Sequence, residues 1–231
     1  MTVVIPGSEY LGKILHVVSQ SFLIPDILGL LIFCVLTFME LGAFAAESKA
    51  RKKGQPAHLL AQLKDMREGP LRWAQNLRQM VADSFLPAGQ KQALLQVLAN
   101  ADMDGENKRM LAKQALDNLE FQYMKTLEKT DLIAKLGPVL GLMGTLIPLG
   151  PGLAALGEGD FASLAQAVIV AFDTTVVGIA TGGIAYLISK VRRRWYEKDL
   201  NDLEMIMEVI LGGEEDVAQE SKTVVAGGRR G

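Results

Sequence analysis

The pattern of hydrophobic and polar positions contains three long stretches with almost no charge. Residues 136–157, LGPVLGLMGTLIPLGPGLAALG, contain no charged residue, and residues 161–189 contain only Asp173. The third stretch, residues 25–46, is almost as apolar. A helix needs about 20 apolar residues to cross a hydrocarbon core roughly 30 Å thick. The pattern therefore predicts an all-α integral membrane protein with three transmembrane helices.

Residues 25–46, the first apolar stretch in chain order, contain two acidic residues, which lie towards its ends. Asp26 follows Pro25 at one end, and Glu40 lies near the other. Polar groups close to a membrane surface can reach water. We therefore expect both carboxylates to be solvated at the two interfaces.

The polar segment between the first and second stretches has a helical composition, rich in Ala, Leu, Gln and Lys. Pro56, Pro70 and Pro87 are placed as first-turn residues of helices. From Glu106 to Thr130 apolar residues recur with helical spacing, which predicts a helix that continues into the second span. The same spacing after the third span predicts that this helix also continues beyond the membrane.

These patterns divide the chain into seven parts, with long helices extending from the membrane into a cytosolic helical domain. The final segment is rich in Gly and charged residues, which is typical of disorder. The expected parts are an outward-facing amphipathic segment (1–22), transmembrane helix 1 (23–46), the cytosolic helical domain (47–130), transmembrane helix 2 (131–157), transmembrane helix 3 (161–190), a cytosolic C-terminal helix (191–211) and a disordered tail (212–231).

Charge is segregated along the chain and predicts its orientation. The 231 residues are 49% hydrophobic and 22% charged, with a formal net charge of -2, which does not favour a nucleic-acid partner. Lys and Arg collect after the first stretch, before the second and after the third, whereas the link between the last two carries only Glu158 and Asp160. Basic residues prefer the cytoplasmic side. We expect an inner-membrane protein in a lipid bilayer, with its N-terminus outside and its C-terminus in the cytosol.

The sequence carries no pattern typical of an enzyme or a metal protein. Cys34 has no second cysteine, and His16 and His58 have no partners at metal-ligand spacing. The stretch DMDGEN, residues 102–107, lacks the glutamate and flanking ligands of a calcium loop. Phosphate-binding glycine loops and nucleophilic triads are also missing. We therefore expect no cofactor, no metal and no enzymatic activity.

Polar residues near the middle of two spans are the candidates for function. Thr145 lies close to the centre of the second span, and Asp173, Thr174 and Thr175 lie close to the centre of the third. An ionised carboxylate at this depth costs about 3 kcal/mol on insertion scales, so it usually faces a bundle interior or water. We expect a proton pathway through these four residues. The alternative is a neutral Asp173 whose hydrogen bond to a hydroxyl only associates helices.

Small residues form a stripe along each of the same two spans. Steps of three and four place them on one helical face, which allows close approach of another helix. Both pore lining and helix packing are compatible with this pattern. The stripes contain Gly141, Gly144 and Pro148 on the second span, and Gly178, Thr181 and Gly182 on the third.

Two of these segments resemble the signature helices of the MotA/TolQ/ExbB proton-channel family. Residues 137–146, GPVLGLMGTL, are similar to its GLLGT-like motif, with Thr145 at the threonine. Residues 171–180, AFDTTVVGIA, are similar to its AL-x-x-T-x-x-G-L-like motif, with Thr175 at the threonine. The resemblance is strong from Asp131 to about Tyr196. Before that it is one of topology, that of the ExbB/TolQ branch.

The resemblance implies a ring, usually of five copies, whose second and third spans line a pore. Inside the ring, two copies of a single-span ExbD/TolR/MotB-like partner carry the proton on a membrane aspartate level with the ring threonines. Two features depart from the family pattern. Thr181-Gly182-Gly183-Ile184 lacks the usual proline, and Asp173 adds a carboxylate to the ring subunit.

The expected function is thus that of a ring-forming stator subunit in a motor driven by the proton-motive force, which energises transport or envelope work. The alternatives are a structural membrane scaffold and a sodium-driven stator subunit, since carboxylate and hydroxyl oxygens also suit a hard cation. A secondary transporter is less favoured, because no inverted repeat is visible and three spans are few.

Overall fold

The structure is a computed structural model, and it describes residues 8–51, 70–84, 86–100 and 105–227. It divides into two compact units. Unit 1 comprises Met1–Phe44 and Glu128–Lys190, and unit 2 comprises Ala45–Leu127 and Val191–Gly231. Each unit is described below by itself.

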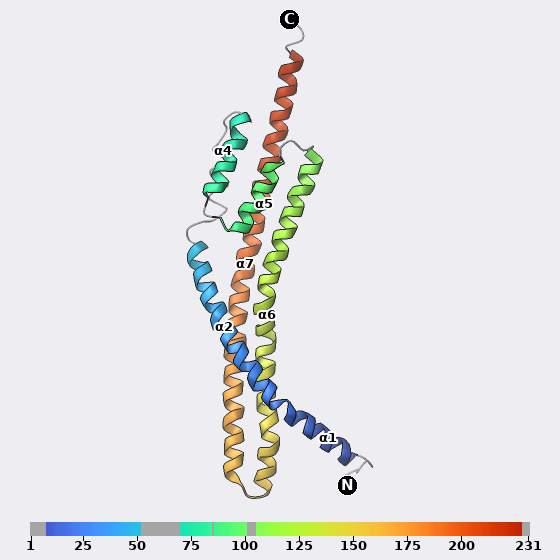
Figure 1. Cartoon of the computed structure of the whole chain (residues 1–231), viewed down its shortest axis with the longest axis vertical. Helices are drawn as coiled ribbons and strands as arrows, with labels where there is room; N and C mark the ends of the chain where they lie inside the picture. The colour runs from blue at the N-terminus through green and yellow to red at the C-terminus, as the bar shows by residue number, and fades with distance from the viewer. Residues whose placement is uncertain (1–7, 52–69, 85, 101–104, 228–231) are drawn as a thin grey trace. The chain divides into compact units, whose positions relative to one another are not determined.

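Every regular element among the described residues is an α-helix, which confirms the all-α prediction (Figure 1). The three long helices each contribute to both units. The helices are α1 (Ser8–Ser21), α2 (Leu23–Arg51), α4 (Pro70–Asp83), α5 (Ala88–Ala99), α6 (Gly105–Gly157) and α7 (Phe161–Gly227).

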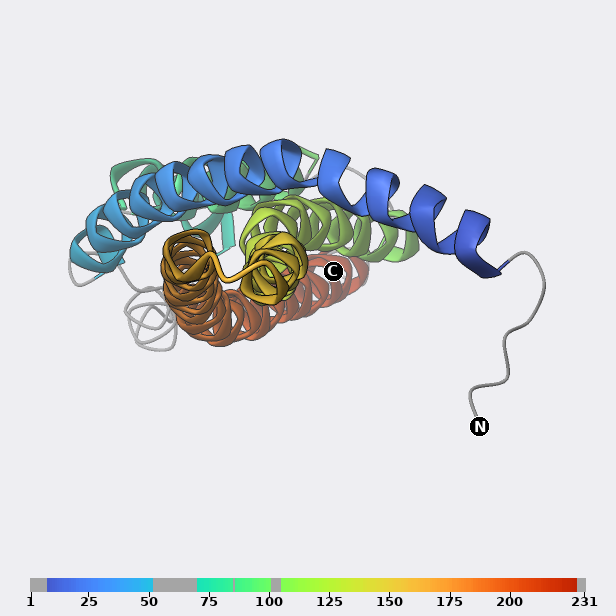
Figure 2. The same cartoon turned by 90° about the horizontal axis from the view of Figure 1, so that it is seen from below.

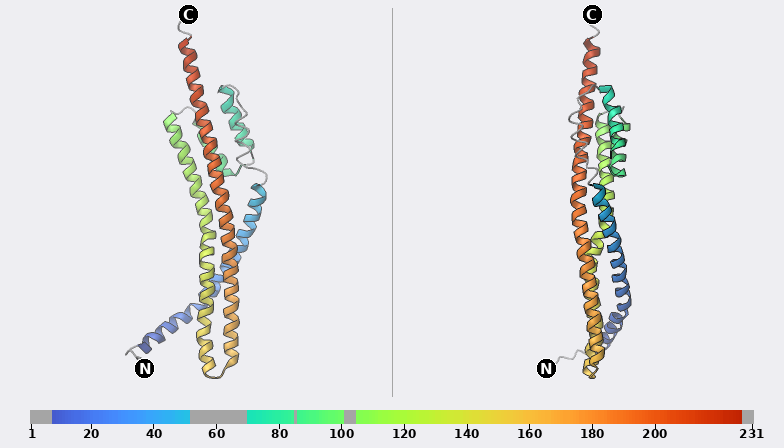
Figure 3. Two further views of the ribbon diagram at one scale, coloured as in Figure 1. Left: turned by 180° about the vertical axis from the view of Figure 1, so that it is seen from behind. Right: turned by 90° about the vertical axis from the view of Figure 1, so that its left-hand side faces the viewer.

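Unit 1 is built on an antiparallel hairpin of α6 and α7 (Figure 3). The link between them turns at Gly159, whose φ of 85° lies in the left-handed region that glycine adopts without strain. Asp160 then caps α7, because its carboxylate accepts a hydrogen bond from the backbone N–H of Ser163 at 3.1 Å. Hydrogen bonds from the side chain and the backbone of Ser163 lower the pKa of the exposed Asp160 carboxyl.

In unit 1, α2 crosses one face of this hairpin (Figures 1 and 2). Large apolar side chains cover its other sides, including Leu142, Phe172 and Val176, and Phe38 lies on the outer side of α2; each is more than half exposed. A soluble surface rarely displays so much apolar area. Three helices are long and apolar enough to cross a membrane, over Tyr10–Arg51, Gly105–Gly157 and Phe161–Leu211, and the protein is an integral membrane protein.

A hydrogen bond joins the end of α1 to α6, and the missing N–H of a proline in α6 explains why its acceptor is free. Pro151 has no N–H, so the carbonyl of Ile147, four residues earlier, has no donor within its own helix. The Gln20 side chain donates to this carbonyl at 3.1 Å. Tyr10–Phe22, which the sequence pattern assigns to an outward-facing segment, thus continue the first candidate span. Gln20 at the end of α1 contacts α6, whereas the apolar side chains earlier in α1 are exposed.

Unit 2 has its own hydrophobic core. It is made by α4, α5 and the parts of α6 and α7 that belong to this unit, and its larger members are almost completely buried. The core consists of Leu77, Val81, Leu86, Ala93, Leu94, Val97, Leu98, Ala112, Ala115, Leu119, Leu203, Ile206, Met207 and Ile210.

The helix-start signals predict the described short helices well. Pro70 is the first residue of α4, and Pro87 directly precedes α5. Pro56 and the helix predicted around it lie outside the described residues. The continuous helices predicted across the ends of the second and third spans are confirmed by α6 and α7.

The C-terminal tail differs from the expectation of disorder from residue 212. In the structure α7 continues to Gly227. The segment from Glu214 to Lys222 contains no Gly or Pro, and six of its nine residues are Glu, Gln, Ala or Lys, which are good helix formers and extend a helix that has already begun.

Candidate functional site

The glycines of α6 and α7 meet each other at the centre of the hairpin. A Cβ on Gly178 would lie 2.7 Å from the carbonyl oxygen of Gly137 and 2.7 Å from Cα of Gly141. A Cβ on Gly182 would lie 2.6 Å from Cδ of Pro138. These neighbours are backbone or ring atoms, which cannot move aside as the end of a side chain can. Both stripes of small residues therefore serve close packing of α6 against α7 within one chain.

The other members of the two stripes belong to the same interface. Thr181 is 4% exposed and its hydroxyl donates to the Val177 carbonyl at 2.8 Å. Pro148 is buried as well. Gly144 faces Thr174, since a Cβ on Gly144 would lie 2.6 Å from Cβ of Thr174. Of the two interpretations that the sequence leaves open for these residues, helix packing accounts for the contacts of the four glycines, Gly141, Gly144, Gly178 and Gly182.

Thr145 and Thr175 lie at one level of the hairpin and on one side of it. They follow Gly144 and Thr174, which face each other across the interface. Each residue turns a helix by about 100°. Because α6 and α7 run in opposite directions, the residues that follow two facing residues turn towards the same side of the pair. Depth and side are therefore both shared by the two threonines.

Both threonines are half-buried, and their hydroxyl protons are engaged within their own helices. Thr145 donates to the Leu142 carbonyl at 2.6 Å, and Thr175 donates to the Ala171 carbonyl at 2.9 Å. A hydroxyl that donates in this way keeps its oxygen lone pairs free. The pair therefore presents two acceptor oxygens at one level.

Asp173 shares the depth of the threonines but not their side. It precedes Thr174, so it turns away from the interface in the direction opposite to Thr175, about 200° around the helix. Its side chain is exposed on the surface of unit 1. The structure thus brings Thr145, Thr174 and Thr175 near one another and separates Asp173 from Thr175.

The side of the hairpin that α2 covers is the side of Asp173. A Cβ on Gly29 of α2 would lie 3.3 Å from Leu140, and the Gln20 side chain bonds to Ile147. Leu140 and Ile147 both lie on the flank of α6 that the residue before Gly144 also occupies. Among the described residues, the contacts of α2 thus lie on the flank of α6 opposite to Thr145.

The position of Asp26 differs from the expectation that its carboxylate is solvated at a membrane interface. It is 3% exposed, and its Oδ2 atom lies 2.9 Å from the point where a Cβ of Gly144 would be. Gly144 is near the middle of the second apolar stretch, so Asp26 lies level with the threonines rather than at a membrane surface. Sequence reasoning missed this because the register of α2 against the hairpin is set by tertiary contacts.

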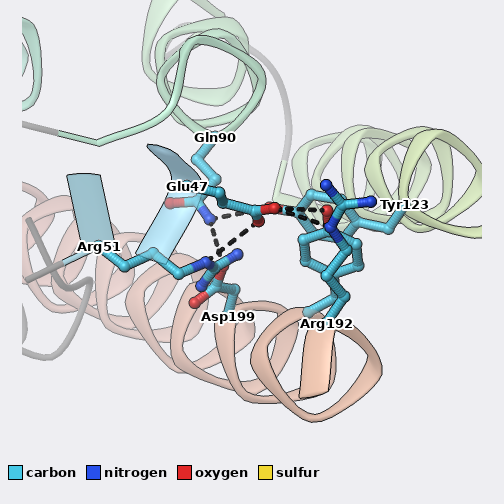
Figure 4. A network of polar contacts seen from close by, with 7 residues as sticks. Glu47, Arg51, Gln90, Tyr123, Arg192 and Asp199 are labelled. Atoms are coloured by element: carbon cyan, nitrogen blue, oxygen red, sulfur yellow. Dashed lines mark hydrogen bonds and ion pairs between the residues drawn. The ribbon is translucent and has the colours of Figure 1, made fainter. Parts of the chain in front are cut away.

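Unit 2 contains a separate cluster of buried charges that sequence reasoning did not identify (Figure 4). Arg51 bonds to Glu47 at 3.2 Å and to Asp199 at 2.8 Å, and Arg192 bonds to Glu47 at 3.0 Å. The Gln90 side chain donates to Asp199 at 2.9 Å. The cluster borders a cavity of about 710 Å³. Its residues are spread over α2, α5 and α7, so no local motif signals it.

Burial changes the acidity of several groups in this cluster. It raises the pKa of Asp199, and the Arg51 guanidinium opposes that rise. Burial also raises the pKa of Tyr123 to about 12 and raises the pKa of Tyr196. The two rings stack with centroids 4.2 Å apart, and Arg51 lies 5.4 Å from the Tyr196 ring centroid. These contacts are those of a structural cluster that fixes helices within unit 2.

A comparison with known families shows to which family the chain belongs. Residues 78–205 match the sequence profile of the MotA/TolQ/ExbB proton channel family, which is more than half of the chain. The chain belongs to the MotA/TolQ/ExbB proton channel family. No curated protein matches the chain.

Membership of the MotA/TolQ/ExbB family relates the hairpin to proton channels, which its packing alone does not do. The family is one of proton channels and not a class of enzymes. The match begins at residue 78 and so includes α5 and parts of unit 2. The resemblance noted from the sequence, which is strong only from Asp131, therefore reaches further upstream than its motifs indicate.

Proposed function

We propose that this protein is the ring-forming subunit of a proton-driven stator, and that protons pass along the side of the hairpin formed by Thr145 and Thr175. The observation that carries the proposal is the position of these two threonines. They share one level and a side of α6 and α7 on which no described contact of α2 falls. In a ring of hairpins, that side can face the central passage while α2 lies outside.

The proposal includes a partner, because two acceptor oxygens on each copy do not by themselves carry a proton across a membrane. A single-span ExbD/TolR/MotB-like protein with a membrane aspartate would complete the pathway. The ring is expected to contain five copies, to lie in the inner membrane and to energise transport or envelope work. A short reading frame next to this one that encodes such a chain identifies the partner to be tested.

The test is proton flux into vesicles that contain the complete ring and this partner. Thr175→Val removes an acceptor of hydrogen bonds from the pathway and keeps the volume of the side chain. We expect flux to fall roughly ten- to hundredfold, as for the loss of a hydrogen bond to a charged group. Thr145→Val is expected to act in the same direction.

Thr181→Val is the matched control on the same helix. Its hydroxyl bonds to its own helix as that of Thr175 does, but it is buried between α6 and α7. We expect flux within about twofold of the native value, since the change touches no residue of the pathway. Equal losses in Thr175→Val and Thr181→Val would contradict the proposal.

Three other results would direct the assignment elsewhere. Unchanged flux in all threonine variants, with an intact complex, would favour a structural scaffold. Flux that follows a sodium gradient and ignores a proton gradient would favour a sodium-driven stator. A large loss in Asp173→Asn would return this carboxyl to the pathway, which its side of α7 does not support within one chain.

A further inference from the structure

Asp26 is a buried carboxyl at mid-depth of unit 1. Its side chain is 3% exposed, and neither of its carboxylate oxygens has a hydrogen-bond partner in the described chain. Oδ2 lies 2.9 Å from the position of a Cβ on Gly144, and Oγ1 of Thr174 lies 2.7 Å from the same point. The carboxyl is therefore placed where α2 meets both helices of the hairpin.

No cation is placed to balance a negative charge on Asp26. In the described part of unit 1, α6 carries no charged residue between Lys135 and its end, and Lys135 is about 13 Å from Gly144 along the helix at 1.5 Å per residue. Asp173 lies at the same depth and can only oppose charge on Asp26. Among the side chains that the structure describes in this unit, the other titratable groups are Tyr10, Lys13 and His16 of α1, Cys34 and Glu40 of α2, Glu128, Lys129, Asp131 and Lys135 of α6, Glu158 and Asp160 of the link, and Asp173, Tyr186 and Lys190 of α7.

Two polar groups near the Asp26 carboxyl, at Gly144 and Thr174, are acceptors of hydrogen bonds rather than donors. Pro148 has no N–H, so the carbonyl of Gly144, four residues earlier, has no donor within α6. The Thr174 hydroxyl already donates to the Val170 and Ala171 carbonyls at 2.9 and 3.0 Å, and only its lone pairs remain. A neutral carboxyl has one O–H to donate to such neighbours, whereas a carboxylate has none.

We propose that Asp26 is a proton-binding site inside each copy of the chain, occupied at neutral pH. The bound proton lets the carboxyl donate to the Gly144 carbonyl or to the Thr174 hydroxyl oxygen, and so holds α2 against the hairpin. Release of the proton leaves a carboxylate facing acceptors, which weakens this contact. The site lies across the interface from Thr145 and Thr175, and it does not depend on the function proposed for them.

The first test is infrared spectroscopy of the complete protein in lipid vesicles during a pH titration. We expect the C=O band of a protonated carboxyl to persist through neutral pH, to disappear at alkaline pH and to be lost in Asp26→Asn. Asp173→Asn and Glu40→Gln are the matched controls, and both should retain this band. An Asp26→Asn protein with every carboxyl band of the native protein would overturn the proposal.

A second measurement needs no variant and therefore does not depend on the folding of Asp26→Asn. Solid-state NMR of the native protein with ¹³C-labelled aspartate follows the Cγ resonance of Asp26 itself. The shift of a protonated carboxyl at neutral pH supports the site. The shift of a carboxylate at neutral pH rejects it, whatever the flux through the threonines.

Discussion

Asp26 and Asp199 are the two most buried carboxyls among the described residues, and their surroundings favour different charges. Asp199 is 5% exposed and bonds to the Arg51 guanidinium at 2.8 Å. Asp26 is 3% exposed and has no cation beside it. Burial of a charge is costly unless it is paired, so Asp199 can stay ionised in its pair while Asp26 is better neutral.

Replacing Arg51 by Met should destabilise unit 2, because Asp199 would remain buried without its cation. We expect a loss of about 3 kcal/mol at neutral pH, the low end of the range for breaking a buried pair, since the Arg51 side chain is 18% exposed. Thermal unfolding followed by tryptophan fluorescence measures the loss, because Trp195 lies 5.0 Å from the guanidinium. Arg193→Met on the exposed side of α7 is the control.

The same variant should show a distinctive dependence on pH. Burial raises the pKa of Asp199 above its unfolded value, so the stability linked to its proton is fully present below the unfolded pKa and is lost as pH rises through the folded pKa. Without Arg51 the pKa rises further. The deficit of Arg51→Met should therefore shrink as pH falls below neutral. A deficit that grows on acidification would contradict this account.

The pairing of α6 with α7 depends on glycine positions that leave little or no room for a Cβ. Gly137, Gly141, Gly178 and Gly182 bring the two backbones into direct contact. In lipid, such close approach replaces the hydrophobic driving force that packs helices in water. The two helices are therefore held together by close packing of their backbones. A single methyl group added at the interface can separate them.

Gly178→Ala should lower the stability of the hairpin by about 1–3 kcal/mol, the usual range for overpacking. The reason is that its Cβ would lie 2.7 Å from backbone atoms of α6. Gly183→Ala on the same helix is the matched control, because nothing lies within 4 Å of its Cβ position. Midpoints of thermal unfolding in detergent compare the two. Equal effects of both changes would show that glycine acts through helix propensity rather than through fit.

The protein as a whole combines three membrane-spanning helices with a second unit that has its own apolar core and buried charges. Its basic residues flank the spans on the side of unit 2, whereas the link between α6 and α7 carries Glu158 and Asp160. Positive charge on short flanking segments resists transfer across the membrane. This distribution predicts unit 2 in the cytosol and the link outside.

Cysteine labelling of whole cells tests this orientation. In a Cys34→Ala background, Glu158→Cys should react with a membrane-impermeant maleimide in intact cells, after the outer envelope is made permeable. Lys113→Cys, on an exposed position of α6 in unit 2, should react only when the inner membrane is opened. The reverse pattern would invert the topology and place the basic flanks outside.

The sequence by itself determined the long helices, their membrane character and the depth of the polar residues on α6 and α7, because apolar length and helical spacing are local properties of a chain in lipid. It also placed Thr145 and Thr175 in motifs of the MotA/TolQ/ExbB family. Only the tertiary structure decided which side each residue faces. Asp173 and Thr175 are two residues apart and turn to different sides, and this matters only once Thr174 is known to face Gly144.

The same limit explains Asp26 and the charged cluster of unit 2. The position of Asp26 opposite Gly144 follows from the register of α2 on the hairpin, and that register is set by side-chain packing between distant segments. Glu47, Gln90 and Asp199 come from separate helices and meet only in the folded unit. The spacing of residues along the chain reflects the periodicity of a single helix. It carries no information about the contacts between two helices.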